Sequence, residues 1–192
     1  MRKTLFYQGP PPVVPKRLRV RPARPGDVAA LAALVRLYAE QGILLPRTEE
    51  NLRKSIEIFR VISAKGYLLA CGVLERYTPT VAELRSLAVV PGLRGGGLGR
   101  KLVQALLDEA RDRDMEMVFA LTYQVEFFAR LGFSPINREL IPWKAWKDCL
   151  QCPKRECCDE VAMACWLRPG APASPPALPL LPFWSPQRTP FS

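Results

Sequence analysis

The chain of 192 residues is long enough for one compact domain, and its 48% hydrophobic and 24% charged residues are typical of a globular protein. It contains no histidine, which excludes Ser-His-Asp and Cys-His catalysis and any zinc or haem site that needs a histidine ligand. The net charge of +10 suits a polyanionic small molecule. Because the basic residues are scattered and not interleaved with aromatics, we expect no nucleic-acid partner.

Composition divides the chain into three parts. Residues 1–16 carry four prolines and no periodic pattern, which predicts an N-terminal arm. Residues 17–168 form the predicted domain, with a cysteine-rich insertion at 143–160, and residues 169–192 are so rich in proline that we expect an extended or disordered tail. No apolar run reaches the roughly 18 residues of a membrane span, and the start lacks a secretory signal, so we expect a cytoplasmic protein with no membrane partner.

The domain alternates between helical and strand patterns. The expected elements are, in chain order, a strand at 18–24, a helix at 27–41, a helix starting near Thr48, strands at 59–65, 67–77 and 80–90, a helix from 98 to about 113, a strand at 115–123, a short helix at 126–132 and strands at 133–140 and 161–167. Asp27 is the expected N-cap of the first helix, and Thr78-Pro79 the turn of an antiparallel hairpin. This order predicts an α/β (α+β) domain with a mixed, mostly antiparallel sheet and about four helices.

A glycine-rich turn separates the strand at 80–90 from the next helix, with five glycines within the eight residues 92–99. Glycine amides can approach an anion closely, and a helix N-terminus adds unpaired donors and a positive dipole end, so the turn predicts a pyrophosphate cradle. The spacing excludes a Walker A motif, and a G-x-G-x-x-G fingerprint would need glycine in place of Arg100. The alternative is a flexible turn without a ligand.

The segment Arg94-Gly95-Gly96-Gly97-Leu98-Gly99 resembles the R-G-x-G-x-G/A acetyl-CoA signature of the GNAT acetyltransferase superfamily. The flanking L-A-V-x-P-x-x-R pattern and the later FFARLGF (127–133) agree with it, and the likeness spans residues 18–167. Within the superfamily the chain is most similar to the short, single-domain N-acetylglutamate synthases (amino-acid N-acetyltransferases) of bacterial arginine biosynthesis. This similarity rests on GILLPRT (42–48), AELRSLAV (82–89), TYQVEFFARLGF (122–133) and WKDCLQCPKRECCDEVAM (146–163).

The resemblance implies a GNAT fold whose sheet is splayed between its fourth and fifth strands, here 80–90 and 115–123. Acetyl-CoA, the implied cosubstrate, would lie in the split, and backbone N–H groups at a bulge near 87–89 would polarise its carbonyl. The implied coenzyme-binding residues are Leu87, Ala88, Val89, Arg94, Gly95, Gly96, Gly97, Leu98, Gly99, Arg100 and Phe128.

In such enzymes the acceptor amine attacks the thioester directly, after losing a proton. The family pattern puts Glu83 in the position of the base, acting through water; the alternative is an ordinary solvated strand residue. The tyrosine that protonates the leaving thiolate in many relatives is replaced by Phe128, so Tyr123 or Ser86 would substitute, or the thiolate would leave unassisted.

Two arginines are candidates for binding a substrate carboxylate, since a guanidinium can hold one bidentately. Arg85 shares one strand face with Glu83, and Arg47 lies in the loop between the first two helices. The alternative for each is a surface arginine.

Cys149-x-x-Cys152, Cys157 and Cys158 place four cysteines within ten residues. A structural zinc or iron-sulfur site, a redox-sensitive pair and reduced thiols that brace the loop are three interpretations of this cluster. Cys71 and Cys165 lie in predicted strands, where we expect them to be buried.

The sequence therefore predicts an acyltransferase that moves the acetyl group of acetyl-CoA to the α-amine of an amino acid, with L-glutamate, the substrate of the first step of arginine biosynthesis, as the first candidate. The alternatives are a GNAT enzyme for another amine (a protein N-terminus, polyamine or antibiotic) and a non-catalytic acyl-CoA-binding module, which Phe128 favours. Antiparallel strands near the sheet edge are compatible with a homodimer.

Overall fold

The computed structural model describes residues 4–6, 18–142, 144, 149–152 and 157–168. Most of the predicted arm, the tail at 169–192 and parts of the cysteine-rich insertion lie outside the described residues. Within the described part of the chain, no helix is long and apolar enough to cross a membrane.

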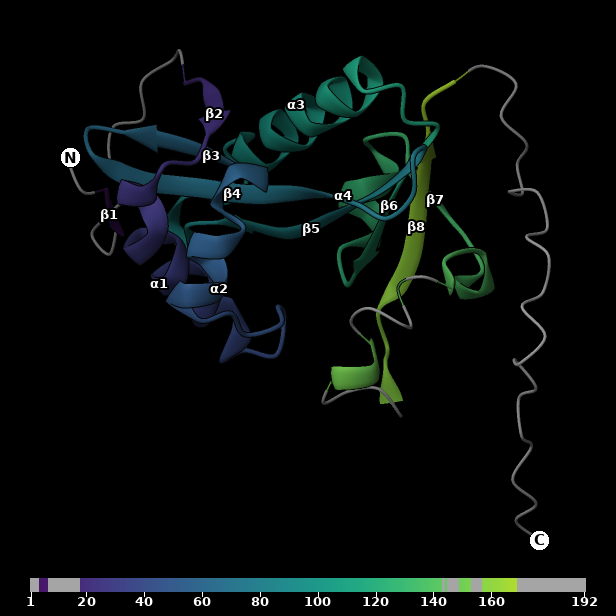
Figure 1. Cartoon of the computed structure of the whole chain (residues 1–192), viewed down its shortest axis with the longest axis horizontal. Helices are drawn as coiled ribbons and strands as arrows, with labels where there is room; N and C mark the ends of the chain where they lie inside the picture. Colours follow the sequence, from purple (N-terminus) through teal and green to yellow (C-terminus); the bar gives the residue numbers. More distant parts are fainter. Residues whose placement is uncertain (1–3, 7–17, 143, 145–148, 153–156, 169–192) are drawn as a thin grey trace, which may run out of the picture.

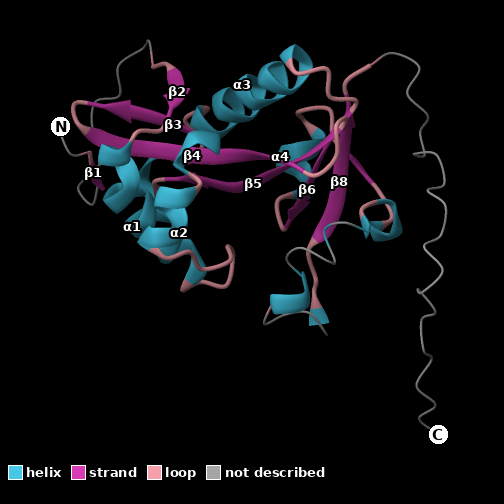
Figure 2. Ribbon diagram, viewed as in Figure 1, coloured by secondary structure: helices cyan, strands magenta, loops and turns pink. Residues whose placement is uncertain are grey.

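The described elements form one mixed sheet with helices on both faces (Figures 1 and 2). The strands are β1 (Leu5–Phe6), β2 (Val20–Pro22), β3 (Phe59–Ala64), β4 (Tyr67–Arg76), β5 (Val81–Val89), β6 (Met117–Thr122), β7 (Ser134–Pro135) and β8 (Val161–Trp166), and the α-helices are α1 (Val28–Ala39), α2 (Glu49–Lys54), α3 (Leu98–Asp112) and α4 (Val125–Ala129). The strand order is β2-β3-β4-β5-β6-β8-β7, with β1 pairing separately with β4. The β1–β4 and β5–β6 pairs are parallel and the others antiparallel, which confirms the predicted fold class.

Helix α3 covers one face of the sheet, while α1 and α2 lie on the other (Figure 1). The face that α3 buries is the apolar stripe read from its sequence: Leu98, Leu102, Val103, Leu106, Leu107 and Ala110. Since α3 starts soon after β5, this packing holds the glycine-rich turn against the end of β5.

The sheet splits between β5 and β6. These parallel strands are paired only at residues 81–83 of β5 and 117–119 of β6, where Val81 lies opposite Met117 and Glu83 opposite Phe119. Beyond that point β5 stays paired with β4 as far as Val89, and β6 stays paired with β8 as far as Thr122. The predicted splay is therefore confirmed, and Glu83 is the last paired residue before the gap.

A β-bulge interrupts β5 just past the split. Val73 of β4 pairs with Arg85 and Cys71 with Ala88, so Ser86 and Leu87 together face Gly72. Ser86 has a φ of +51°, a left-handed value that is uncommon for a residue with a side chain. The sequence placed a bulge at 87–89; the extra residue lies slightly earlier, at 86–87.

Two local predictions were only partly correct: Asp27 occupies the N-cap position of α1, and a strand begins at Ser134, but the details differ. Asp27 does not cap α1 with its side chain; its buried carboxylate instead accepts hydrogen bonds from Arg21, from the backbone N–H of Arg24 and from the hydroxyl of Thr4. The predicted strand at 133–140 is reduced to Ser134–Pro135, because Asn137 begins a 3₁₀ turn by accepting a hydrogen bond from the backbone N–H of Glu139 at 3.0 Å.

Candidate active site

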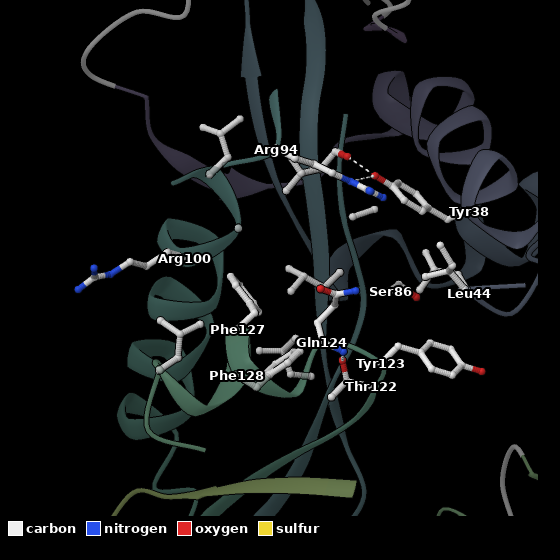
Figure 3. A pocket seen from close by; sticks show the side chains of 18 of the residues that line it. Tyr38, Leu44, Ser86, Arg94, Arg100, Thr122, Tyr123, Gln124, Phe127 and Phe128 are labelled. Atoms are coloured by element: carbon white, nitrogen blue, oxygen red, sulfur yellow. Dashed lines mark hydrogen bonds between the residues drawn. The ribbon is translucent and has the colours of Figure 1, made fainter. Parts of the chain in front are cut away.

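A cleft of about 560 Å³ passes through the split in the sheet. It is lined from both sides, by residues of α1 and the following loop, β5, the glycine-rich turn, the start of α3, the end of β6, α4 and the residue before β8 (Figure 3). Of the predicted site residues, the lining contains Arg85, Ser86, Leu87, Ala88, Val89, Arg94, Gly95, Gly97, Leu98, Gly99, Arg100, Tyr123 and Phe128. Glu83, Gly96 and Arg47 are not part of the lining.

The glycine-rich turn is exposed at one end of this cleft. Gly95 and Gly97 both have a φ of +79°, and Gly97 directly precedes the first residue of α3. Of the amides of residues 95–97, only that of Gly96 donates within the described chain, to the carbonyl of Leu93 at 3.4 Å. The turn therefore presents unpaired donors next to a helix N-terminus, the arrangement that binds a phosphate or pyrophosphate.

Gly99 allows α3 to start close to α4. A Cβ atom at Gly99 would lie 3.3 Å from the ring of Phe127 and 3.6 Å from a methyl group of Val89. The glycine thus lets the aromatic ring pack beside the first turn of the helix, where both line the cleft.

Arg94 is held in place by Tyr38 of α1. Its Nε donates to the hydroxyl of Tyr38 at 2.9 Å, its guanidinium carbon lies 4.8 Å from the centre of the ring, and the hydroxyl in turn donates to the carbonyl of Val89 at 2.5 Å (Figure 3). The arginine is therefore fixed beside the end of β5. The side chain of Arg100 points away from the cleft in the same view (Figure 3).

The other end of the cleft contains Arg85, beside a buried ionic cluster. Its Nη1 lies 3.7 Å from Oε2 of Glu83, and the two side chains are 11% and 3% exposed. Glu83 is also contacted by the ammonium of Lys144 and the hydroxyl of Tyr77. The interpretation of Glu83 as an ordinary solvated strand residue is therefore wrong. The predicted sharing of one strand face by Glu83 and Arg85 is confirmed.

The candidate proton donors differ in their surroundings. The hydroxyl of Tyr123 donates to Asp159 at 2.8 Å and points away from the cleft (Figure 3). Ser86 lies at the bulge and lines the cleft. Phe128 is buried edge-on between Phe127 and Phe133, with ring centres 5.2 and 5.0 Å apart, and contributes an apolar wall.

Arg47 and the cysteines lie apart from the cleft lining. The Arg47 guanidinium is 5.9 Å from the centre of the Phe59 ring. Cys71 and Cys165 are buried as predicted, and burial raises the pKa of both thiols, that of Cys71 to about 12. Among the described residues, which include all four cysteines of the insertion, no three Cys, Asp or Glu side chains are close enough to hold a metal ion. The zinc or iron-sulfur interpretation thus has no support in this part of the chain.

The structure adds four polar residues that sequence reasoning missed. Tyr38 fixes Arg94, Lys144 and Tyr77 hold Glu83, and Glu160 lines the cleft at the start of β8. No local pattern distinguishes them. Tyr38 and Lys144 act on residues 56 and 61 positions away in the chain, Tyr77 reaches Glu83 across the turn between β4 and β5, and Glu160 lies across the cleft.

Comparison with known proteins agrees with this geometry. Residues 29–133 match the model of the acetyltransferase (GNAT) family, which is more than half of the chain. The chain belongs to the GNAT acetyltransferase family. It is accordingly an acyltransferase.

Similar proteins include N-acetyltransferases and amino-acid acetyltransferases. An uncharacterized N-acetyltransferase of Chlorobaculum tepidum is 41% identical over 144 residues, which are 75% of this chain and 93% of the relative. The amino-acid acetyltransferase of Mycobacterium tuberculosis is 39% identical over 121 residues, covering 62% of this chain and 69% of the relative. Among solved structures, N-acetylglutamate synthase from Neisseria gonorrhoeae, complexed with coenzyme A and N-acetyl-glutamate, superposes with a TM-score of 0.70 at 28% identity, covering 81% of this chain but only 36% of that one.

Proposed function

We propose that this acetyltransferase uses acetyl-CoA to acetylate the α-amine of an amino acid, with L-glutamate, and thus arginine biosynthesis, as the first candidate. The observation that carries the proposal is Arg85, an arginine that lines the cleft beside the bulge at residues 86–87. The amino-acid acetyltransferases and the N-acetylglutamate synthase among the similar proteins support it.

The glycine-rich end of the cleft is suited to the coenzyme. The exposed amides of Gly95 and Gly97 and the first turn of α3 would bind the pyrophosphate, and the fixed Arg94 would add a positive charge. The pantetheine arm would then follow the edge of β5 that no longer pairs with β6, past Val89 and Leu87, to the bulge. There, backbone groups released from pairing can donate to the thioester carbonyl.

The opposite end is suited to an amino acid. Arg85 would bind a carboxylate through charge-assisted hydrogen bonds. The acceptor ammonium must lose a proton before it attacks, and Glu83 is the carboxylate that forms an ion pair with Arg85. Because Glu83 is buried beside the cleft and does not line it, we propose that the proton reaches it through water.

The two candidate proton donors for the leaving thiolate, Ser86 and Tyr123, both line the cleft. Tyr123 already donates to Asp159, so Ser86 is the better placed of the two hydroxyls. A thiol with a pKa of roughly 8.5, like that of free cysteine, is also a tolerable leaving group without assistance.

Thiol release from acetyl-CoA, measured across a panel of amino acids, peptides and polyamines, tests the proposal. We expect turnover with amino acids and most with glutamate. Replacing Arg85 by methionine should raise the KM for the amino acid about 10-fold to 100-fold, since a hydrogen bond to a charged group is worth about 1.5–3 kcal/mol. The KM for acetyl-CoA should stay within about threefold of the parent value, well below that effect.

The other outcomes are equally informative. Turnover with peptides or polyamines but with no amino acid would refute the proposed acceptor and leave the family assignment intact. Coenzyme A binding without turnover on any amine would favour the non-catalytic module that Phe128 suggested.

A further inference from the structure

Lys144 is a buried lysine that neither the predicted site nor the proposed function has used. It lies in the short segment after the 3₁₀ turn at Arg138–Leu140, and only 8% of its side chain is exposed. Its Nζ lies 2.7 Å from Oε1 and 3.0 Å from Oε2 of Glu83, which is 61 residues earlier in the chain. The ammonium thus contacts both carboxylate oxygens.

The carboxylate of Glu83 is held from three directions. Besides Lys144, the hydroxyl of Tyr77 donates to Oε2 at 2.9 Å, and Nη1 of Arg85 approaches the same oxygen at 3.7 Å. Apolar groups lie close by: Tyr77 packs edge-on against Phe119, whose ring centre is 5.5 Å away, in a cluster that includes Ile141.

A charge in such a place needs a compensating partner. An isolated carboxylate away from water is strongly destabilised and either takes up a proton or turns toward solvent. Arg85 alone is a weaker partner, since it lies farther from Glu83 and also lines the cleft. Lys144, more deeply buried than Arg85, makes the shorter contacts.

We propose that Lys144 is a positioning residue for acetyl transfer: it holds the Glu83 carboxylate in place at the last paired position before the split in the sheet. Lys144 thereby acts through Glu83, and it links the start of the cysteine-rich insertion to the end of the cleft that contains Arg85. The inference rests on the proposed role of Glu83 in accepting the proton from the amine. It does not depend on which amine is the acceptor.

The test is a double-mutant cycle with Lys144→Met, which keeps the length and apolar stem of the side chain, and Glu83→Gln. We expect Lys144→Met to lower kcat by about 100-fold or more, the lower end of what a general base contributes, with the KM for acetyl-CoA within about threefold of the parent. In the Glu83→Gln background the same substitution should change kcat by no more than about threefold, because the group through which it acts is already absent.

Two further variants separate positioning from structural support. Lys144→Arg retains the positive charge and should recover at least about tenfold of the kcat that Lys144→Met loses. Arg60→Met is the matched control: it removes a cation from a half-buried ion pair, with Glu109 of α3 at 2.5 Å, outside the cleft lining. The control should lower the unfolding midpoint and leave kcat within about threefold of the parent, as expected for a remote site.

Several results would overturn the inference. One is a folded Lys144→Met variant with a kcat close to that of the parent. Another is a double variant in which Lys144→Met lowers kcat by as large a factor as it does in the parent, so that the effects of the two substitutions are independent. If Lys144→Met alone fails to fold, the double variant, which removes both charges, decides: activity equal to that of Glu83→Gln supports the proposal, and much lower activity refutes it. If no amino acid is acetylated, the proposed acceptor fails, and the same cycle is run on the amine with the highest turnover.

Discussion

Replacing Gly97 by alanine tests whether the glycine-rich turn binds the coenzyme. Gly97 has a φ of +79°, and a Cβ atom there would meet nothing within 4 Å. The substitution therefore causes no clash, but it forces a residue with a side chain into the left-handed region, at a cost of about 1–2 kcal/mol. For a protein of this size, such a loss lowers the unfolding midpoint by about 2–8 °C.

Gly66 provides the matched control. It has a φ of +83°, and a Cβ atom added there would also meet nothing within 4 Å, but it lies in the turn between β3 and β4, outside the cleft lining. Gly66→Ala should therefore destabilise the fold by a similar amount and leave coenzyme binding unchanged. Any additional effect of Gly97→Ala then reports on the ligand.

Alanine keeps the amide, but relief of the strain at a φ of +79° would turn that amide away from the pyrophosphate. We therefore expect Gly97→Ala to weaken binding of coenzyme A by about 10-fold to 100-fold, because losing one charge-assisted hydrogen bond costs about 1.5–3 kcal/mol. Isothermal titration calorimetry gives the Kd of both variants, and scanning calorimetry gives their stability. If both variants bound coenzyme A as tightly as the parent, the amides of this turn would not be the pyrophosphate site, and the proposed position of the coenzyme would be wrong.

Three other predictions concern the interior. Burial raises the pKa of Asp27, but hydrogen bonds from Arg21 and Thr4 outweigh it and hold the pKa below the ordinary 3.8; the carboxylate thus stabilises the fold at neutral pH, and this contribution is lost as the pH falls through the folded-state pKa. Asp27→Asn should cost about 1.5–3 kcal/mol in urea unfolding at pH 7 and progressively less as the pH falls below 3.8, whereas a cost that does not change with pH would contradict this. Because the pKa of Cys71 is raised to about 12, its thiol should resist alkylation at pH 8 in the folded protein, while the exposed Cys157 reacts. Mass spectrometry can follow the labelling of both thiols, and equal labelling rates would show that Cys71 is accessible. Gly72→Ala places a Cβ 3.2 Å from methyl groups on α3 and should destabilise the fold by about 1–3 kcal/mol. An unchanged unfolding midpoint would mean that α3 can shift to make room at no cost in stability.

Local features of this protein could be predicted because they depend on residues close together in the chain. The apolar stripe of α3 follows from helical periodicity, and the glycines permit the positive φ angles of the turn before it. The antiparallel pairing of β4 with β5 follows from the short turn at Thr78-Pro79. Such features need no knowledge of the rest of the molecule.

Where local conformational preferences competed with tertiary contacts, the predictions from the sequence were only partly correct. Asp27 has the chemistry of an N-cap, but an arginine on β2 and a threonine from the N-terminal arm offered its carboxylate better partners. The predicted strand after α4 ends at Pro135, because Asn137 stabilises a 3₁₀ turn in its place.

By itself the sequence determined the fold class, the glycine-rich turn and the strand face shared by Glu83 and Arg85, since these follow from spacing along a helix or strand. Only the tertiary structure decided which cation pairs with each buried carboxylate. A buried carboxylate requires a cation, but the chain has 28 lysines and arginines, and nothing in their spacing selects one. Folding selected Lys144, because the segment after Arg138–Leu140 returns to the split in the sheet.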